Sequence, residues 1–259
     1  MRMMKKVLGT VTVLALSASL LAGCGSTAAS PVSSAASTAA ESTTSSVVSE
    51  TTSAAADENV AAAAQLLNDL TGSYQELWPV ILADEYQQTW LDDCTALVGE
   101  ENAEAAFEKL SSMVTSDVYG EDAVEAYANG GGAYFCGFTN SLATLTFDGE
   151  TSTISGTDKD GNVLFSHTYH YIGMEPVRGL YEFESDDADS GEFTYFFLAP
   201  DTSAETYHIE FRYGSDAEAL SQYDAGEYAY WVASGIATDC DQTMIDNCIE
   251  LFCTENLAG

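Results

Sequence analysis

The sequence predicts a mainly β domain with α additions: an antiparallel β-barrel preceded by N-terminal helices and followed by a C-terminal helix. Apolar residues recur at helical spacing before about residue 113 and again near the C-terminus. From about residue 130 they instead alternate with polar residues, and turn-forming pairs such as Asp-Gly separate the short runs. Successive short strands joined by tight turns are typical of an antiparallel meander, which a small domain closes into a barrel.

The first 23 residues have the features of a lipoprotein signal peptide. An apolar stretch over residues 7–21 follows a short positive region that contains Arg2, Lys5 and Lys6. The stretch is shorter than the about 20 residues that a membrane-spanning helix needs. Its end, Leu21-Ala22-Gly23-Cys24, resembles the bacterial lipobox, in which the cysteine is lipidated and becomes the new N-terminus. We therefore expect an extracytoplasmic protein anchored to the cell membrane by Cys24; the alternative is a secreted protein with a chance cysteine at its cleavage site.

Residues 24–57 have the composition of a flexible tether. They are rich in Ser, Thr and Ala and contain few bulky apolar residues, so they bury too little surface to offset the entropy of ordering. A helix is the alternative because Ala is abundant, but Ser and Thr runs compete with helix formation. The sequence thus predicts a signal peptide over residues 1–23, a lipidated tether over residues 24–57 and one domain over residues 58–259.

The charge balance limits the partners of this domain. The chain has 41 acidic and 7 basic residues. Three basic residues leave with the signal peptide, so 7 − 3 = 4 remain: Lys109, Lys159, Arg178 and Arg212. Such an acidic domain repels nucleic acid and anionic lipid headgroups. We therefore expect no nucleic-acid partner, and we expect membrane attachment through the lipid alone.

Five cysteines remain beyond the lipidation site, and an odd number cannot pair completely within one chain. Cys248 and Cys253 are five residues apart on the predicted terminal helix, which is a poor spacing for a disulfide within a helix. No Cys-x-x-Cys pair is present, which argues against a tetrahedral thiolate zinc site. Buried free thiols are the preferred interpretation for the whole set, which is Cys94, Cys136, Cys240, Cys248 and Cys253.

The predicted helices precede and follow the β region. Residues 61–70 are rich in Ala and Leu, residues 74–82 are aromatic and apolar, and residues 103–113 place Ala, Phe, Leu and Met at helical spacing. At the C-terminus, residues 242–257 form one apolar helical face from Met244, Ile245, Cys248, Ile249 and Phe252. The apolar stripes over residues 103–113 and 242–257 are typical of helices that pack against a core.

The predicted strands cover residues 142–147, 151–156, 163–171, 179–183, 192–198 and 206–213. Between the second and third strands, residues 158–162 (DKDGN) superficially match the start of a calcium-binding loop. The twelfth position of that loop is Tyr169 and not the bidentate Glu that the pattern requires, and the flanking segments are strands. The segment is therefore predicted to be a hairpin turn.

Several of these segments, in this order, resemble the ZinT (YodA-like) family of zinc-binding domains in bacterial envelopes. The likeness covers residues 66–231 approximately and is carried by residues 70–79 (LTGSYQELWP), 169–173 (YHYIG), 179–184 (GLYEFE), 199–200 (AP) and 207–214 (YHIEFRYG). The resemblance implies a calycin, lipocalin-like barrel. It also implies zinc binding or trafficking, with metal-uptake transporter components as partners.

The family's zinc site is only partly present in this chain. The resemblance implies three histidine ligands, and His208 matches the second histidine of the family's His-x-His pair. Thr206 stands at the first position of that pair, and Phe196 stands at the remaining histidine position, four residues before Pro200. Because Phe cannot ligate zinc and Thr is a poor ligand, the resemblance implies a degenerate site.

A rebuilt site for zinc would use His208, Glu210 or Glu205, and one of His170 and His167. His208 and Glu210 are two residues apart and share one face of a strand, whereas His167 and His170 are three apart and face opposite ways. The alternative is that His208 is a satisfied barrel histidine and that metal binding has been lost.

Besides metal binding, the sequence bears on two other classes of function, a ligand-binding or structural module and an enzyme. A lipocalin-like module for a small apolar ligand, or a structural envelope module, is suggested by a barrel rich in aromatic residues, namely Tyr169, Tyr171, Tyr181, Tyr195, Phe196, Phe197 and Tyr207. The same residues are more commonly core. Enzyme activity is not expected, because the sequence has no Gly-x-Ser-x-Gly, no His-Glu-x-x-His and no glycine-rich phosphate loop. A nucleophilic cysteine paired with a histidine stays an open alternative at this point.

Overall fold

The computed structural model describes residues 58–200 and 206–258. The predicted signal peptide, Cys24, the tether and Glu205 lie outside these residues. In the part of the chain that is described, no helix is long and apolar enough to cross a membrane.

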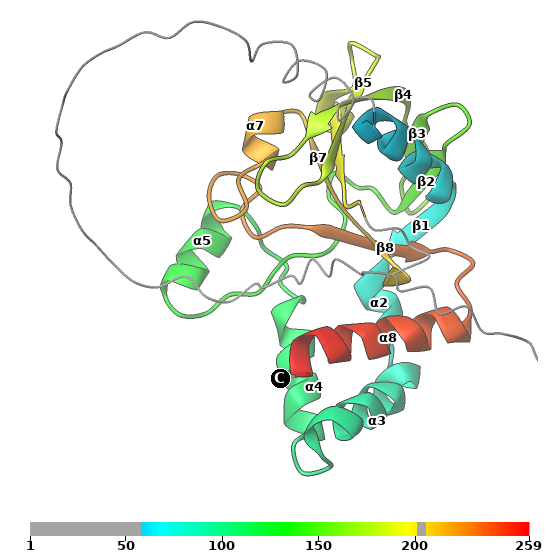
Figure 1. The fold of residues 1–259 in the computed structure, drawn as a ribbon. Coiled ribbons are helices and arrows are strands. Elements are labelled where there is room, and N and C mark those ends of the chain that lie inside the picture. The colour runs from blue at the N-terminus through cyan, green and yellow to red at the C-terminus, as the bar shows by residue number, and fades with distance from the viewer. Residues whose placement is uncertain (1–57, 201–205, 259) are drawn as a thin grey trace, which may run out of the picture. The chain divides into compact units, whose positions relative to one another are not determined.

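The described residues form a closed barrel in which each strand is antiparallel to the next and the first strand pairs with the last (Figure 1). The strands are β1 (Gly72–Glu76), β2 (Thr144–Asp148), β3 (Thr153–Thr157), β4 (Val163–Met174), β5 (Tyr181–Ser185), β6 (Tyr195–Leu198), β7 (Ile209–Gly214) and β8 (Ala233–Ala237). The barrel and the helices around it confirm the predicted mainly β fold class of lipocalin-like, calycin type with α additions.

Aromatic and aliphatic side chains fill the barrel. Phe196 is fully buried, and its ring lies 5.4 Å from the rings of both Tyr169 and Tyr213 and 6.4 Å from that of Phe211. Alternation along β7 directs Phe211 and Tyr213 into this core and leaves Glu210 and Arg212 on the outer face. Of the predicted aromatic residues, Tyr169, Phe196 and Phe197 are buried in this core, Tyr171, Tyr181 and Tyr195 are partly buried against it, and Tyr207 packs against the helices. A recess of about 320 Å³ lies elsewhere, beside Trp78 and Cys136.

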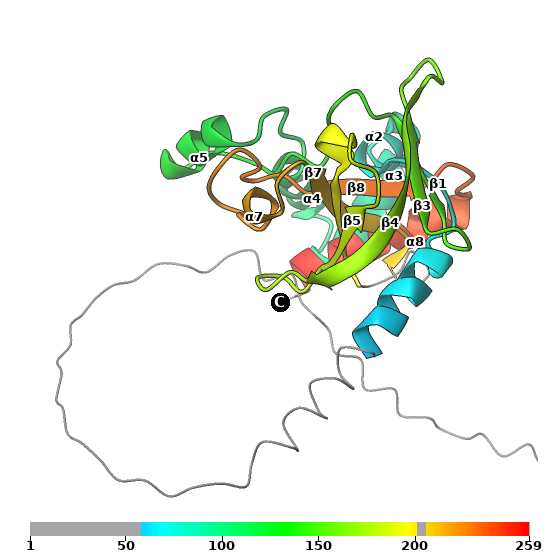
Figure 2. The same cartoon turned by 90° about the horizontal axis from the view of Figure 1, so that it is seen from above.

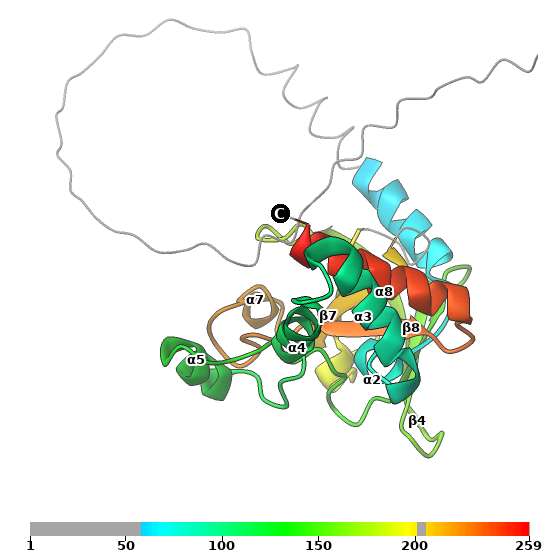
Figure 3. The same cartoon turned by 90° about the horizontal axis from the view of Figure 1, so that it is seen from below.

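Helices surround the barrel, and some of them form a second layer on the outer side of β8. The helices are α2 (Leu77–Ile81), α3 (Gln87–Val98), α4 (Ala103–Met113), α5 (Glu121–Ala128), α7 (Ala217–Leu220) and α8 (Gln242–Leu257), with short 3-10 turns η1 (Asp84–Tyr86) and η2 (Gly191–Phe193). Figure 3 looks onto α3, α4 and α8, which lie together across the barrel. They share a second core with Ile236 of β8, around the fully buried Trp90.

A helix over residues 58–69 covers another side of the barrel. Its Leu66 and Leu67 are buried in the barrel core. The β2–β3 turn packs so closely against this helix that a Cβ on Gly149 would lie 2.4 Å from the Cα of Asn68. Glycine at this position therefore permits the close approach. Figure 2 shows this helix on the side of the barrel away from α5 and α7.

The turn between β3 and β4 has the predicted hairpin geometry. The Asp158 carboxylate accepts hydrogen bonds from the backbone N–H groups of Asp160 (2.9 Å) and Asn162 (2.8 Å). Gly161 adopts a φ of +81°, which favours glycine. The Asp158 side chain thus closes a turn, and these hydrogen bonds hold the pKa of Asp158 below its usual value.

Several elements differ from the sequence expectation. The sequence predicts residues 74–82 in the N-terminal helical region, yet residues 72–76 form β1. The sequence predicts no element at β8 or at the helices α3, α5 and α7. Both strands depend on partners distant in sequence, because β1 pairs with β2 on one side and with β8 on the other.

Candidate metal-binding site

His208 lies just before β7, on the outer face of the barrel. Its side chain is 18% exposed. The ring Nδ1 lies 2.7 Å from the backbone carbonyl oxygen of Thr206, and because a carbonyl only accepts, Nδ1 donates. Between them, Tyr207 adopts a left-handed φ of +65°, which is rare for a bulky residue. This turn brings the Thr206 carbonyl back to the imidazole and fixes the orientation of the ring.

Glu210 places a carboxylate beside the second nitrogen of this imidazole, Nε2. It lies two residues further along the chain on the same outer face, as predicted, and its Oε1 is 3.8 Å from Nε2 of His208. The Glu210 side chain is half exposed, so solvent reaches the gap between the two groups. On the opposite edge of the ring, Sγ of Cys248 from α8 lies 4.0 Å from Nδ1. The site is therefore built from the start of β7 and one face of α8.

The charges of this pair favour each other. Desolvation opposes protonation of His208, but the Cys248 and Glu210 side chains outweigh it and raise the pKa of His208 well above 6.5. Desolvation likewise opposes ionisation of Glu210, but His208 and, more distantly, Arg178 lower the pKa of the carboxyl group. At neutral pH the two groups therefore form an imidazolium–carboxylate ion pair. Any cation that binds between them must displace the imidazolium proton.

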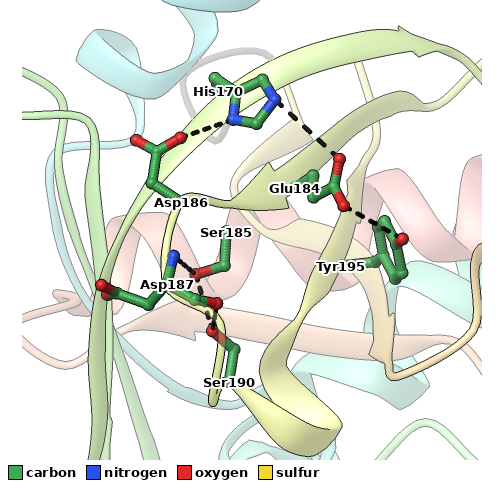
Figure 4. A network of polar contacts seen from close by, with 7 residues as sticks. All are labelled: His170, Glu184, Ser185, Asp186, Asp187, Ser190 and Tyr195. Carbon is green, nitrogen blue, oxygen red and sulfur yellow. Dashed lines mark hydrogen bonds and ion pairs between the residues drawn. The ribbon is translucent and has the colours of Figure 1, made fainter.

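His167 and His170 have partners of their own. Nδ1 of His167 lies 2.8 Å from Asp187, and its ring stacks on Phe165 on the inner face of β4. His170 lies on the outer face, where Nδ1 is 2.8 Å from Asp186 and Nε2 is 4.0 Å from Glu184 (Figure 4). The two histidines face opposite ways, as their spacing predicted. The structure gives each a separate carboxylate and does not join either to His208.

The polar network around His170 extends along the β5–β6 connection. Glu184 accepts a hydrogen bond from the hydroxyl of Tyr195 at 3.2 Å, and Ser190 donates to Ser185 at 2.8 Å. Figure 4 shows that His170 and Glu184 point toward each other from neighbouring strands, while Ser185 and Ser190 close the turn that carries Asp186 and Asp187. These contacts satisfy one another and account for the conformation of this connection.

The positions that the family resemblance marks as ligands do not converge. Phe196 of β6 stands opposite Tyr213 in the barrel core, whereas His208 lies before β7 begins. Thr206 is occupied locally, because its hydroxyl donates to the His208 carbonyl at 2.7 Å. Among residues 58–200 and 206–258, no group of three or more His, Cys, Asp and Glu side chains is arranged to hold a metal ion. A three-imidazole zinc centre therefore does not fit this chain.

A buried charge cluster that the sequence analysis did not identify lies further along β7. The Arg212 guanidinium is fully buried, donates to the backbone carbonyls of Leu220 and Tyr228, and lies 4.4 Å from the Tyr223 ring. Arg178 lies 4.0 Å from the same ring. Burial lowers the pKa of Arg212 to about 10, so it stays charged at neutral pH. The sequence offered one signal for this cluster. Basic residues are scarce, and both arginines are among the four basic residues expected in the mature chain.

A buried carboxylate completes this cluster. Glu175 is fully buried and accepts hydrogen bonds from the N–H groups of Val177 (2.7 Å) and Arg178 (2.6 Å) and from the Tyr223 hydroxyl (3.3 Å). The cluster therefore connects the β4–β5 turn with the segment that follows β7. Most of its hydrogen bonds join side chains to backbone groups of the chain itself, which indicates a structural role.

Comparison with known proteins places the chain beside ZinT-like structures. Neither a family model nor a curated protein matches the sequence. The Zn(II)-bound ZinT-like domain of Streptococcus pneumoniae AdcA is similar, with 15% identity and a TM-score of 0.45 over 71% of this chain and 89% of that domain. Zn(II)-bound AdcA of the same organism is similar at 14% identity and a TM-score of 0.42, over 70% of this chain and 34% of AdcA. The structural neighbours of this chain are therefore ZinT-like.

Proposed function

We propose that this chain is a membrane-anchored extracytoplasmic protein that binds divalent zinc weakly, as cargo, between His208 and Glu210. The observation that carries the proposal is the orientation of His208. Its Nδ1–H is held by the Thr206 carbonyl, so Nε2, which faces the Glu210 carboxylate, is the nitrogen that can bind a metal once its proton is displaced. Metal-binding histidines commonly donate their second nitrogen to a backbone carbonyl or carboxylate in this way, which fixes the tautomer.

The distance between the two groups suits a shared ion. Zinc binds imidazole nitrogen and carboxylate oxygen at about 2.0–2.2 Å, so two donors of one tetrahedral ion lie roughly 3.4 Å apart. Nε2 of His208 and Oε1 of Glu210 are 3.8 Å apart, and the half-exposed Glu210 side chain is free to close this difference. The strained φ of Tyr207 supports the proposal as well, since backbone strain is concentrated at functional sites.

Two protein ligands make a weak and exchangeable site. Structural zinc sites have four protein ligands and catalytic sites three, whereas the described residues offer two here. Water fills the other positions in this proposal, or Glu205, which lies outside the described residues. Weak binding suits a protein that buffers zinc or passes it to an uptake transporter and needs no catalytic step. The lipobox at Cys24 supports placing this activity on the outer side of the membrane.

Isothermal titration with zinc tests the proposal on the full chain carrying Cys24→Ser. We expect saturable binding that His208→Ala abolishes and that Glu210→Gln weakens by about 10-fold or more, since even indirect partners of a metal ligand contribute 10–100-fold. His170→Ala is the matched control, because this imidazole also contacts carboxylates but lies in the separate network of Figure 4. Zinc binding that is absent from the parent chain, or unchanged by His208→Ala, would contradict the proposal.

A further inference from the structure

Two buried thiols face each other across the helical layer. Cys94 of α3 and Cys253 of α8 are both fully buried, and their Sγ atoms are 3.9 Å apart. The two residues are separated by 159 positions in the sequence, so their approach is a consequence of the fold. Figure 3 shows α3 and α8 adjacent in the layer that covers the barrel.

Other described cysteines have different neighbours. Cys248 of α8 faces His208 at 4.0 Å. Cys136 lies beside Ser234 and Trp78 in the same helical core. The domain has five cysteines, so a bond between Cys94 and Cys253 leaves three thiols, which are Cys136, Cys240 and Cys248.

Negative charges on α3 and α8 repel each other, which favours a covalent link between the two helices. Neither α3 nor α8 contains a Lys or Arg residue, and Asp93 of α3 faces Asp246 and Glu250 of α8 closely enough that these charges raise its pKa, in addition to desolvation. The repulsion acts directly beside the thiols, because Asp93 is adjacent to Cys94 in sequence. A covalent bond between α3 and α8 would hold the helices together against this repulsion.

We propose that Cys94 and Cys253 form an intramolecular disulfide when the protein meets a disulfide oxidant. One cysteine loses its proton, and its thiolate attacks a small-molecule disulfide, which forms a mixed disulfide and releases one reduced thiol. The second cysteine thiolate attacks the cysteine sulfur of that intermediate, forms the Cys94–Cys253 bond and releases the second reduced thiol. The protein loses two electrons and two protons, and the oxidant gains them.

The fold determines when this reaction takes place. The Sγ atoms must approach from 3.9 Å to about 2.0 Å, which requires a rotation of the side chains. Burial raises the pKa of both thiols, and the Asp93 charge adds to this effect, so thiolate is scarce in the folded protein. Oxidation is therefore expected to proceed during folding and to be slow once α3 and α8 are packed.

Non-reducing peptide mass spectrometry tests the proposal on the full chain carrying Cys24→Ser. The protein is refolded with oxidised and reduced glutathione, blocked with an alkylating reagent after denaturation, and digested. We expect a cross-linked peptide pair containing Cys94 and Cys253, with the other three cysteines alkylated. Recovery of Cys94 and Cys253 as alkylated thiols, or linked to other cysteines, would overturn the proposal.

Thermal unfolding provides a second readout. Reduction of the refolded chain is expected to lower Tm by roughly 10 °C, because the bond closes a long loop. The same treatment should leave Tm unchanged in the Cys94→Ala/Cys253→Ala double variant, whereas the matched variant Cys248→Ser, on the same helix, should keep the full shift. A shift that persists in the double variant or disappears in Cys248→Ser counts against the Cys94–Cys253 bond.

Discussion

At the scale of single residues, orientation distinguishes the three histidines. All three contact carboxylates, so a neighbouring acid does not by itself identify a metal ligand. His167 and His170 use Nδ1 for their carboxylates, at 2.8 Å in each case. His208 instead uses Nδ1 for a backbone carbonyl and directs Nε2 to Glu210. His208 is therefore the histidine held by a backbone group, and its Nε2–carboxylate distance of 3.8 Å is shorter than the 4.0 Å between His170 and Glu184.

The raised pKa of His208 makes zinc binding dependent on pH. Because the folded imidazole holds its proton above pH 6.5, zinc must displace that proton at neutral pH. We expect the affinity to rise with pH until the pKa of His208 is passed, with release of about one proton per zinc below that point. Titration calorimetry in two buffers of different ionisation enthalpy measures this number. Binding without proton release at pH 6.5 would contradict the assignment of His208 as a ligand.

Sequence reasoning at this scale found the pair and missed the cluster behind it. The period of two along a strand places His208 and Glu210 on one face without any knowledge of the fold. The burial of Arg212 could not be read in the same way, because its partners are backbone carbonyls of a later segment, which every residue possesses. The tautomer of His208 was equally hidden, since it depends on the backbone turn at Tyr207.

At the scale of elements, α8 connects the helical core with the candidate site. Its N-terminus is capped by Asp241, whose carboxylate accepts from the Met244 N–H at 2.9 Å. Ile245 and Ile249 are buried in the helical layer, while Cys248 reaches His208. The packing of α8 against α3 therefore affects both the thiol pair and the surroundings of the metal site.

Asp93 is expected to destabilise the α3–α8 contact at neutral pH. Desolvation and the charges of Glu250 and Asp246 raise its pKa above 3.8, so the destabilisation grows as pH rises from 3.8 to the folded pKa and is fully present above that pKa. In reducing buffer, Asp93→Asn should raise the free energy of unfolding by about 1 kcal/mol at pH 7. The gain should vanish below about pH 3.8, where Asp93 is protonated in both states.

Urea unfolding across this pH range measures the effect. Asp92→Asn is the control, because Asp92 is exposed and contacts only its own helix through Gln88 at 2.8 Å. It is expected to change stability by less than about 0.5 kcal/mol. A gain for Asp93→Asn that is independent of pH would rule out relief of charge as its cause.

Arg212 fixes the segment after β7 to the barrel. Its guanidinium supplies the buried carbonyls of Leu220, Gln222 and Tyr228 with hydrogen bonds. Arg212→Met keeps the volume but leaves these carbonyls and the nearby Glu175 charge uncompensated, so we expect a loss of about 3–5 kcal/mol in the free energy of unfolding. Urea unfolding tests this against Lys159→Met in the exposed β3–β4 turn, which should be nearly neutral. A loss below about 1 kcal/mol would show that water replaces the guanidinium.

At the scale of the whole domain, local and non-local order differ in how well the sequence predicts them. The helices over residues 103–113 and 242–257 match their predicted bounds, because an apolar stripe with a period of 3.6 is a local property. β1 and β8 were missed, because both are short and become strands through partners that are distant in the sequence. Gly235 of β8 shows this, since a Cβ there would lie 3.1 Å from the Ile209 side chain.

The expectation of a closed barrel came from the alternating pattern and the family resemblance, and the structure confirms it. It was harder to predict whether the barrel interior holds a ligand cavity or packed core side chains. Of the seven aromatic residues that suited either a ligand cavity or a core, Tyr169, Phe196 and Phe197 are buried in the barrel core, and Tyr171, Tyr181 and Tyr195 pack against it. Tyr207 packs against the helical core instead. The proposed binding function uses the outer surface, where His208 and Glu210 lie.

The position of bound zinc tests this account most directly. Crystals of the full chain carrying Cys24→Ser, soaked in zinc, would be measured on both sides of the zinc absorption edge. The account predicts an anomalous peak between Nε2 of His208 and the Glu210 carboxylate, absent from crystals of His208→Ala. A peak at the His167–Asp187 or His170–Asp186 pair instead, with none at His208, would contradict it.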